Sequence, residues 1–235
     1  MSPDIADKVA GLIDPEEVAD LALHLGRIEA PAGAEGPAAD AVAEWLAAQG
    51  FAPKRIGLVA VRPSIVARLP GGNGKRLVFN AHLDTAISRS DTLVYRDPSQ
   101  PKYISAWREG DRLFGNGVVN DKGPMAAFLV AAAAIKRSGV DLAGSLLLHA
   151  VPGEIGLEPV DEFQGPEHLG KDLGARYAIA HGVVGDAALV AEATGNAIGW
   201  VQPGKAFFKV TVFGGEPMYT PFSIPDPDPV TNWMV

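Results

Sequence analysis

The segment 77–85 constrains the fold most, because an apolar run ends there in a His-x-Asp triplet. Such a run is typical of a buried strand, and His82 falls where this strand would break into a loop. Asp84 can then turn back and accept the proton of the imidazole nitrogen that does not face a metal, which fixes the tautomer of the ring. A single histidine at a strand end is more often structural. The metal-site interpretation therefore depends on other segments of the chain.

Helix and strand patterns alternate along the chain. A helix is expected from the Asp14–Pro15 start signal to about Leu25, and a second over residues 37–49, ended by Gly50. Residues 125–137 predict a helix that is apolar nearly all round and therefore buried. Strands are predicted at 64–69, 77–83, 145–151 and 187–191, the last two covered on both faces. The alternation predicts an α/β fold with a mostly parallel sheet sandwiched by helices.

The composition excludes several classes of protein and of site. A net charge of −8 argues against nucleic-acid binding, because phosphate recognition needs a concentrated basic surface. The 235 residues contain no cysteine, so a metal would be held by imidazole and oxygen ligands. The longest apolar stretch, residues 125–135, is too short to span a bilayer, and the N-terminus lacks the features of a signal peptide. We therefore expect a soluble cytoplasmic protein that binds neither nucleic acid nor membranes.

Ligand-type side chains lie at four expected strand ends: those of three strands named above, and the end of residues 113–119, which lead into Asn120. In an open α/β sheet, functional groups gather outside the carboxyl ends of the strands. A histidine with several carboxylates is suited to Zn²⁺ or Mn²⁺, because imidazole and carboxylate oxygen are ligands of those ions. Each carboxylate taken singly is more often a cap or loop residue, but together they favour a metal site. The four positions are His82 with Asp84, Asn120 with Asp121, Glu154, and Glu192.

These motifs resemble those of the zinc-dependent metallopeptidase and deacylase family that includes acetylornithine deacetylase, succinyl-diaminopimelate desuccinylase, aminoacylase and carnosinase. Residues 80–85 match the family's His-x-Asp motif, and residues 117–124 resemble Gly-x-x-Asp-x-Lys-Gly. Residues 154–156 match the end of Glu-Glu-x-Gly, and residues 191–194 resemble Glu-Pro-Thr. Four motifs in the same order make the resemblance specific.

The resemblance implies a role for each matched residue. His82 and Glu192 would hold one metal ion, Glu154 would hold a second, and Asp84 would orient His82. In the family an aspartate bridges the two ions, and the first glutamate of the Glu-Glu pair activates the attacking water. The implied cofactor is one or two ions of Zn²⁺, with Mn²⁺ or Co²⁺ as alternatives. The candidate catalytic residues are Asp84 and Glu154, and the candidate metal ligands are His82, Asn120, Asp121, Glu154 and Glu192.

The resemblance also implies a domain organisation. Residues 1–203 would form an aminopeptidase-like or deacylase-like catalytic domain that is incomplete in its C-terminal part, so the chain looks truncated. Residues 204–235 would begin a small α+β lid domain, through which a homodimer is expected. Residues 206–213 alternate like a strand of an exposed sheet and would start this second domain.

The sequence departs from the family pattern at the positions of the bridging ligand, the general base and the lid histidine. In the simplest register the bridging position is Asn120, with Asp121 one place later, and an amide oxygen is a weaker ligand than a carboxylate. A local shift would let Asp121 reach the metal instead. The position of the general base falls on Gly153, with Glu158, Asp161 and Glu162 as alternative bases, and the histidine of the lid motif appears as Met218.

Two functions from different classes follow. The first is a metal-dependent hydrolase of amide bonds in N-acyl amino acids or short peptides. The second is a catalytically impaired relative that keeps the fold and acts as a binding or partner subunit. A flavodoxin-like nucleotide binder is disfavoured, because no glycine-rich phosphate loop follows the first strand. His149 lies inside an apolar run and is expected in the core rather than at a site.

Overall fold

The computed structural model divides the chain into two units, residues 1–198 and 199–235. The residues that it describes are 3–85, 106–155, 170, 172–192, 194–195 and 197–201. The account of the fold is therefore that of the first unit. The predicted boundary near residue 203, the strand expected at 206–213 and the lid domain lie outside the described residues and stay predictions.

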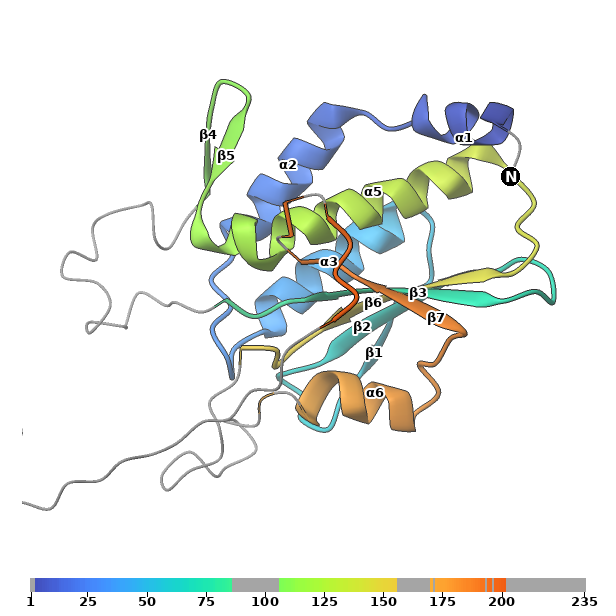
Figure 1. Cartoon of the computed structure of the whole chain (residues 1–235). Coiled ribbons are helices and arrows are strands. Elements are labelled where there is room, and N and C mark those ends of the chain that lie inside the picture. The colour runs from blue at the N-terminus through green and yellow to red at the C-terminus, as the bar shows by residue number, and fades with distance from the viewer. Residues whose placement is uncertain are drawn as a thin grey trace, which may run out of the picture. The chain divides into compact units, whose positions relative to one another are not determined.

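A five-stranded sheet forms the centre of the first unit, with the strand order β1-β2-β6-β3-β7 (Figure 1). Its strands are β1 (Lys54–Ile56), β2 (Ser64–Leu69), β3 (Arg76–His82), β6 (Ser145–Val151) and β7 (Ala187–Val190). A separate hairpin is made by β4 (Trp107–Glu109) and β5 (Arg112–Phe114). The helices are α1 (Pro3–Ala10), α2 (Pro15–Gly26), α3 (Gly36–Ala48), η1 (Val118–Lys122), α5 (Gly123–Ser138), η3 (Asp172–Arg176) and α6 (Tyr177–Ala180).

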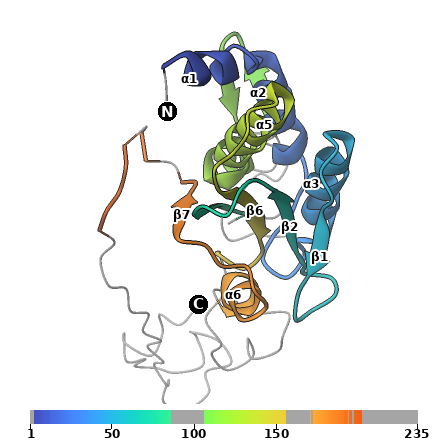
Figure 2. The ribbon, with the colours of Figure 1, turned by 90° about the vertical axis from the view of Figure 1, so that its right-hand side faces the viewer.

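Helices cover both faces of this sheet. α2, α3 and α5 lie on one side and α6 lies on the other, as the view turned by 90° shows most clearly (Figure 2). The predicted α/β class, with a sheet between helices, is confirmed. The sheet is mixed where mostly parallel pairing was expected: β3 pairs in parallel with β6 and β7, whereas β2 is antiparallel to β1 and β6. The short loop 57–63 explains the β1–β2 pairing, because parallel strands need a crossover of a dozen residues or more.

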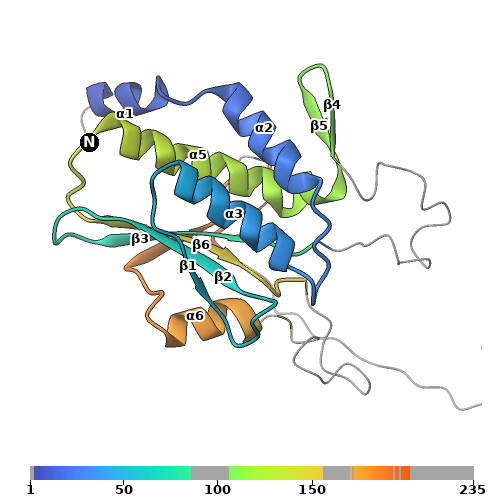
Figure 3. The same cartoon turned by 180° about the vertical axis from the view of Figure 1, so that it is seen from behind.

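The predicted central helix is confirmed and lies in the core. α5 buries Met125, Leu129 and Val130 in one cluster with side chains of α2, α3 and the sheet. It ends at Gly139, whose φ of 65° is the left-handed conformation that commonly closes a helix. Together with η1 it is long and apolar enough to cross a membrane by length and composition alone, but 61% of that window is buried inside the fold. The view from behind shows α5 and α3 lying along the sheet (Figure 3).

The two strands predicted to be covered on both faces have different surroundings. Every residue of β6 is buried, as expected for the middle strand of five. For β7 the prediction is wrong: it is an edge strand, and Leu189 and Val190 are 50% and 56% exposed. A short apolar run has the same sequence pattern whether the strand lies at the edge or in the middle of a sheet. The exposure of β7 therefore follows from the strand order, which the pattern does not predict.

His149 lies in the core of β6, as predicted. The amide nitrogen of Asn80 donates to its Nδ1 at 3.0 Å across the β3–β6 pair. Its Nε2 is buried and has no hydrogen-bond partner within the described part of the chain. Burial disfavours the charged form of the ring and lowers the pKa of His149 to about 4, from an ordinary value of 6.5. The ring is therefore neutral in the folded protein at neutral pH.

We expect His149 to weaken the fold as the pH falls. The unfolded chain binds a proton at this ring below about pH 6.5 and the folded chain only below about pH 4, so stability is lost between these values. His149→Leu removes this term, so between pH 6.5 and 4 the free energy of unfolding of the wild type should fall faster, by up to about 1.4 kcal/mol per pH unit. Denaturant unfolding at several pH values measures this difference. His24→Gln, at an exposed histidine, is the control, and equal slopes for wild type and His149→Leu would contradict the expectation.

Candidate functional site

The site is built where β3 ends and the chain turns sharply. His82 is the last residue of β3 and is 2% exposed. The loop that follows is held by two backbone hydrogen bonds: Leu83 N–H donates to the carbonyl of Val151, and Thr85 N–H donates to the carbonyl of Ala30, both at 2.8 Å. The strand end is therefore fixed to β6 on one side and to the loop after α2 on the other.

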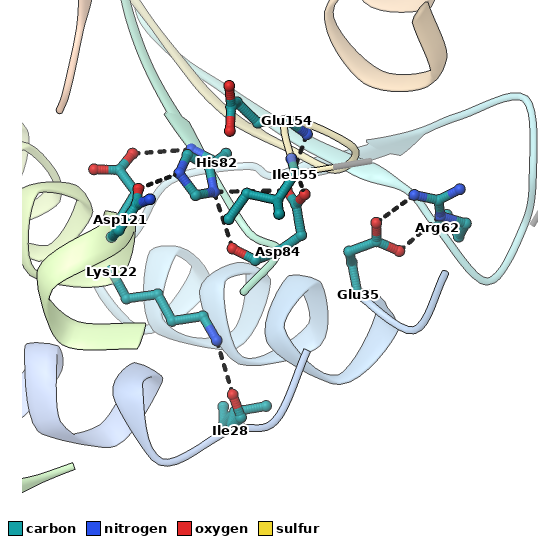
Figure 4. A network of polar contacts seen from close by, with 10 residues as sticks. Ile28, Glu35, Arg62, His82, Asp84, Asp121, Lys122, Glu154 and Ile155 are labelled. Carbon is teal, nitrogen blue, oxygen red and sulfur yellow. Dashed lines mark hydrogen bonds and ion pairs between the residues drawn. The ribbon is translucent and has the colours of Figure 1, made fainter. Parts of the chain in front are cut away.

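Oxygen atoms face both ring nitrogens of His82 (Figure 4). Nδ1 lies 2.9 Å from the backbone carbonyl of Asp84 and 3.6 Å from its carboxylate, and Nε2 lies 2.6 Å from the amide oxygen of Asn120. Burial alone would lower the pKa of His82, but the contact with Asp84, the charges of Asp84 and Asp121, and the contact with Asn120 together raise it to about 9. The environment of this ring thus strongly favours positive charge.

The carboxylate of Asp84 joins two loops. It is fully buried and accepts hydrogen bonds from the backbone N–H groups of Glu154, at 3.1 Å, and Ile155. Burial alone would raise the pKa of Asp84, but His82 and these two amides lower it below its ordinary value. Asp84 thus contacts His82 through its backbone carbonyl, keeps its carboxylate near the ring, and fixes the start of the loop that carries Glu154. The predicted role of Asp84 in orienting the ring stays a prediction.

Asn120 and Asp121, which are neighbours in the chain, both contact His82. Asn120 has an extended backbone (φ −140°, ψ 94°) inside η1, which turns its side chain toward the imidazole. Asp121 is fully buried, and its Oδ2 accepts the backbone N–H of His82 at 3.1 Å. Asn120 and Asp121, the two alternatives for the bridging ligand, thus make different contacts with the same histidine.

One oxygen of Asp121 is the unusual atom of the site. Asp121 Oδ1 is buried and has no hydrogen-bond partner among the residues that the structure describes. Burial raises the pKa of Asp121 to about 7, and the negative charges of Glu192 and Glu154 contribute to the rise. An orphaned carboxylate oxygen next to an imidazole is a place where a cation or a proton is favoured. The donor set fits a metal ion in kind, because imidazole and carboxylate are ligands of Zn²⁺, Mn²⁺ and Co²⁺.

The two glutamates join this cluster less closely. Glu154 is half-buried directly after β6, and Glu192 is exposed after β7. Both act on the pKa of Asp121, so both lie within electrostatic reach of it. Within the described residues, however, no three His, Asp or Glu side chains converge closely enough to hold a metal ion. The structure thus brings His82, Asp84, Asn120 and Asp121 into contact, and places Glu154 and Glu192 around them.

The position of the expected general base has no room for a side chain. Gly153 has a φ of 79°, and a Cβ atom built on it would lie 2.6 Å from the carbonyl oxygen of Gly170. A glutamate at this position would therefore require the backbone to move. The alternative bases Glu158, Asp161 and Glu162, and Met218 of the lid motif, lie outside the described residues.

Three buried charges near the site were not predicted from the sequence. Lys122 is fully buried and donates to the carbonyl of Ile28 at 2.7 Å, and burial lowers its pKa to about 8 although the charge of Asp84 acts the other way. Glu35 and Arg62 form an ion pair in which both side chains are 0% exposed. Lys122 lies inside the motif at residues 117–124, and this position was the sequence signal that could have pointed to it. Glu35 and Arg62 offered no local signal, because charged residues are almost always exposed.

Comparison with known proteins identifies the family. The profile of peptidase family M20/M25/M40 matches residues 78–231, a range that includes every predicted site residue. The chain belongs to this family.

Three of the solved structures that match this chain are those of larger proteins. The dipeptidase Dug1p of Saccharomyces cerevisiae has 18% identity and a TM-score of 0.49, over 62% of this chain and 33% of its own. Human carnosine dipeptidase 1 has 20% identity and a TM-score of 0.49, over 61% of this chain and 34% of its own. The YXEP protein of Bacillus subtilis, a dinuclear metal-binding peptidase of the M20 family, has 13% identity and a TM-score of 0.41, over 72% and 39%. This chain thus spans about a third of the length of the first two.

We expect Gly153→Ala to destabilise the fold more than a matched glycine substitution. Gly182→Ala is the control, because Gly182 has a φ of 89° but open space around its Cβ position, so only the conformational cost of about 1–2 kcal/mol applies. Gly153→Ala adds the contact with Gly170 to that cost, so its free energy of unfolding should be the lower of the two. Denaturant unfolding of both variants measures the difference. Equal free energies of unfolding for Gly153→Ala and Gly182→Ala would contradict the expectation, because they would show that the backbone around Gly153 can move to accommodate a Cβ atom.

Proposed function

We propose that this protein is a metal-dependent hydrolase that cleaves amide bonds in small substrates, either N-acyl amino acids or short peptides. Membership of a peptidase family supports the reaction class. The observation that carries the metal dependence is the orphaned Oδ1 of Asp121 beside His82, where the surroundings favour positive charge.

His82 and Asp121 are the residues that would hold the ion most directly, with Asn120, Glu154 and Glu192 as further ligands. The ion is Zn²⁺ in this proposal, with Mn²⁺ or Co²⁺ as alternatives. When bound, it would polarise the substrate carbonyl and lower the pKa of a water molecule. The work of the chain itself is to hold the ligands, to exclude bulk water and to move a proton.

Each residue of the cluster has a defined task in this proposal. Asp84 holds the His82 ring by its carbonyl and keeps a negative charge beside it, which raises the basicity of the ring. Glu154, held at its backbone by Asp84, is the half-buried carboxylate available to carry a proton. Gly153 cannot do so because it has no side chain.

The second candidate is an impaired relative that binds a small molecule or a partner without turning it over. Two observations favour it: the neutral side chain of Asn120 next to His82, and the lack of room for a carboxylate at Gly153. A cytoplasmic location and a homodimer formed through residues 204–235 are further parts of the proposal, and they hold for either candidate.

We expect metal binding to depend on His82. His82→Ala removes the only imidazole among the candidate ligands, so the metal content after loading with Zn²⁺ and desalting should fall to near zero. His149→Ala is the control, because His149 lies in the core and its loss should change stability but not metal content. Elemental analysis of both proteins measures this. Full occupancy in His82→Ala would refute the site assignment.

The same analysis counts the ions. We expect at most one tightly held ion per wild-type chain, because a neutral amide at Asn120 bridges two dications poorly. Asn120→Asp should raise the occupancy of a second ion. Two tightly bound ions in the wild type would instead indicate that Asp121 serves as a working bridge.

Activity separates the two candidate functions. We expect slow hydrolysis of N-acyl amino acids or dipeptides by the Zn²⁺-, Mn²⁺- or Co²⁺-loaded protein, and none after chelation. The reason is that Glu154 would carry the proton from a position next to that of the family's general base, and the loss of a well-placed base commonly costs about 10²–10⁴-fold. Amino acid release across a substrate panel, with His82→Ala as the blank, measures it. Metal binding without hydrolysis of any substrate would favour the impaired relative.

A further inference from the structure

Residues 28–35, which run from the end of α2 to the start of α3, contact two segments that carry candidate site residues and the loop 57–63 that carries Arg62. The buried Nζ of Lys122 donates to the carbonyl of Ile28 at 2.7 Å, directly after Asp121 in the chain. Thr85 N–H donates to the carbonyl of Ala30 at 2.8 Å, directly after Asp84. At the far end of the segment, Glu35 is paired with Arg62. One short stretch of chain thus connects loops that are distant from one another in the sequence.

We propose that residues 28–35 act as a brace for the site, and that Glu35 and Arg62 are positioning residues for Glu154. Glu154 is a ligand or proton carrier only in the function proposed above, so the inference rests on that function. In this proposal the effect of Glu35 and Arg62 on the site passes through the backbone of the loop that follows β6.

The geometry of the ion pair is suited to fixing a position. Arg62 Nε donates to Glu35 Oε2 at 2.7 Å, and Nη2 donates to Oε1 at 2.5 Å (Figure 4). Two parallel hydrogen bonds hold the guanidinium and the carboxylate in one plane, which sets orientation as well as distance. A buried ion pair often stabilises a fold no more than apolar residues of similar size would. Its directional contacts are therefore the property that apolar residues cannot replace.

The mixed sheet places this pair beside the Glu154 loop. β2 is antiparallel to β6, with Ile65 opposite Ala150, so Arg62 lies near the point where β6 ends. A Cβ atom on Gly153 would lie 3.5 Å from Nη2 of Arg62. The backbone N–H groups of Glu154 and Ile155 are bound by Asp84. The loop is thus bounded by Arg62 at Gly153 and by Asp84 at the next two residues.

The test replaces the pair without leaving a buried charge alone. In Glu35→Leu/Arg62→Met both partners become apolar residues of comparable size, which keeps the core filled and makes folding the expected outcome. The matched control is Glu16→Leu/Arg108→Met, which removes a partly exposed bidentate pair far from Glu154 in the sequence. Arg62→Met alone is less informative, because it would bury the unpaired charge of Glu35.

Two measurements read the result. The first is amide hydrogen exchange in metal-free protein, where we expect at least about tenfold faster exchange at Glu154 and Ile155 in the double variant, with β3 unchanged. The second is Zn²⁺ affinity with the Co²⁺ absorption spectrum, where we expect affinity to fall about 10–100-fold and the spectrum to change. The control pair should alter neither measurement.

Each outcome decides the proposal. Unchanged exchange at Glu154 and Ile155, faster exchange spread evenly over the whole protein, or unchanged Zn²⁺ affinity in the double variant would overturn the positioning role. A wild-type protein that binds no metal at all would refute the proposed function instead. In that case the exchange measurement alone would still decide whether the ion pair positions the Glu154 loop.

Discussion

The buried carboxylate of Asp84 is the interaction on which the arrangement of the site depends. A charged group without access to water is costly unless directed donors meet it. Here the backbone amides of Glu154 and Ile155 donate to the carboxylate, and the ring of His82, at the end of another strand, lies 3.6 Å from it as a charge partner. Satisfying one carboxylate therefore forces the ends of β3 and β6 into a single relative position, and the rest of the polar cluster is assembled around it.

The sequence predicted elements whose signals are local. Asp14 caps α2 by accepting the N–H of Glu16 at 2.9 Å, and Gly139 closes α5 as its position indicated. The contacts of His82 with Asp84 were predictable because they span two residues. The exposure of β7 and the antiparallel course of β2 were not, because strand order depends on which distant segments pair. The Glu35–Arg62 pair joins residues 27 positions apart, so no local sequence pattern predicts it.

Family membership and the geometry of the site give different kinds of information about chemistry. The family indicates where the motifs lie and which class of reaction to expect, whereas the side chains of this chain determine the chemistry that the site can support. Asn120 and Gly153 stand at two positions where the family pattern has charge, and the structure accommodates both changes locally. Asn120 meets His82 through its amide oxygen, and Gly153 occupies a left-handed backbone conformation packed against Gly170. The altered positions are thus part of a consistent local packing.

The antiparallel course of β2 has a consequence for how such a site can vary. In a fully parallel sheet, only loops that leave strands reach the functional edge, and here the loops that leave β3, β6 and β7 carry candidate site residues. Because β2 runs the other way, the loop 57–63 enters the sheet at that same edge while carrying none of the candidate ligands. Substitutions in that loop can therefore adjust the spacing of the cluster while every ligand stays unchanged. In the proposed function, substitutions in this loop are a route to a changed ion preference that leaves the candidate ligands in place.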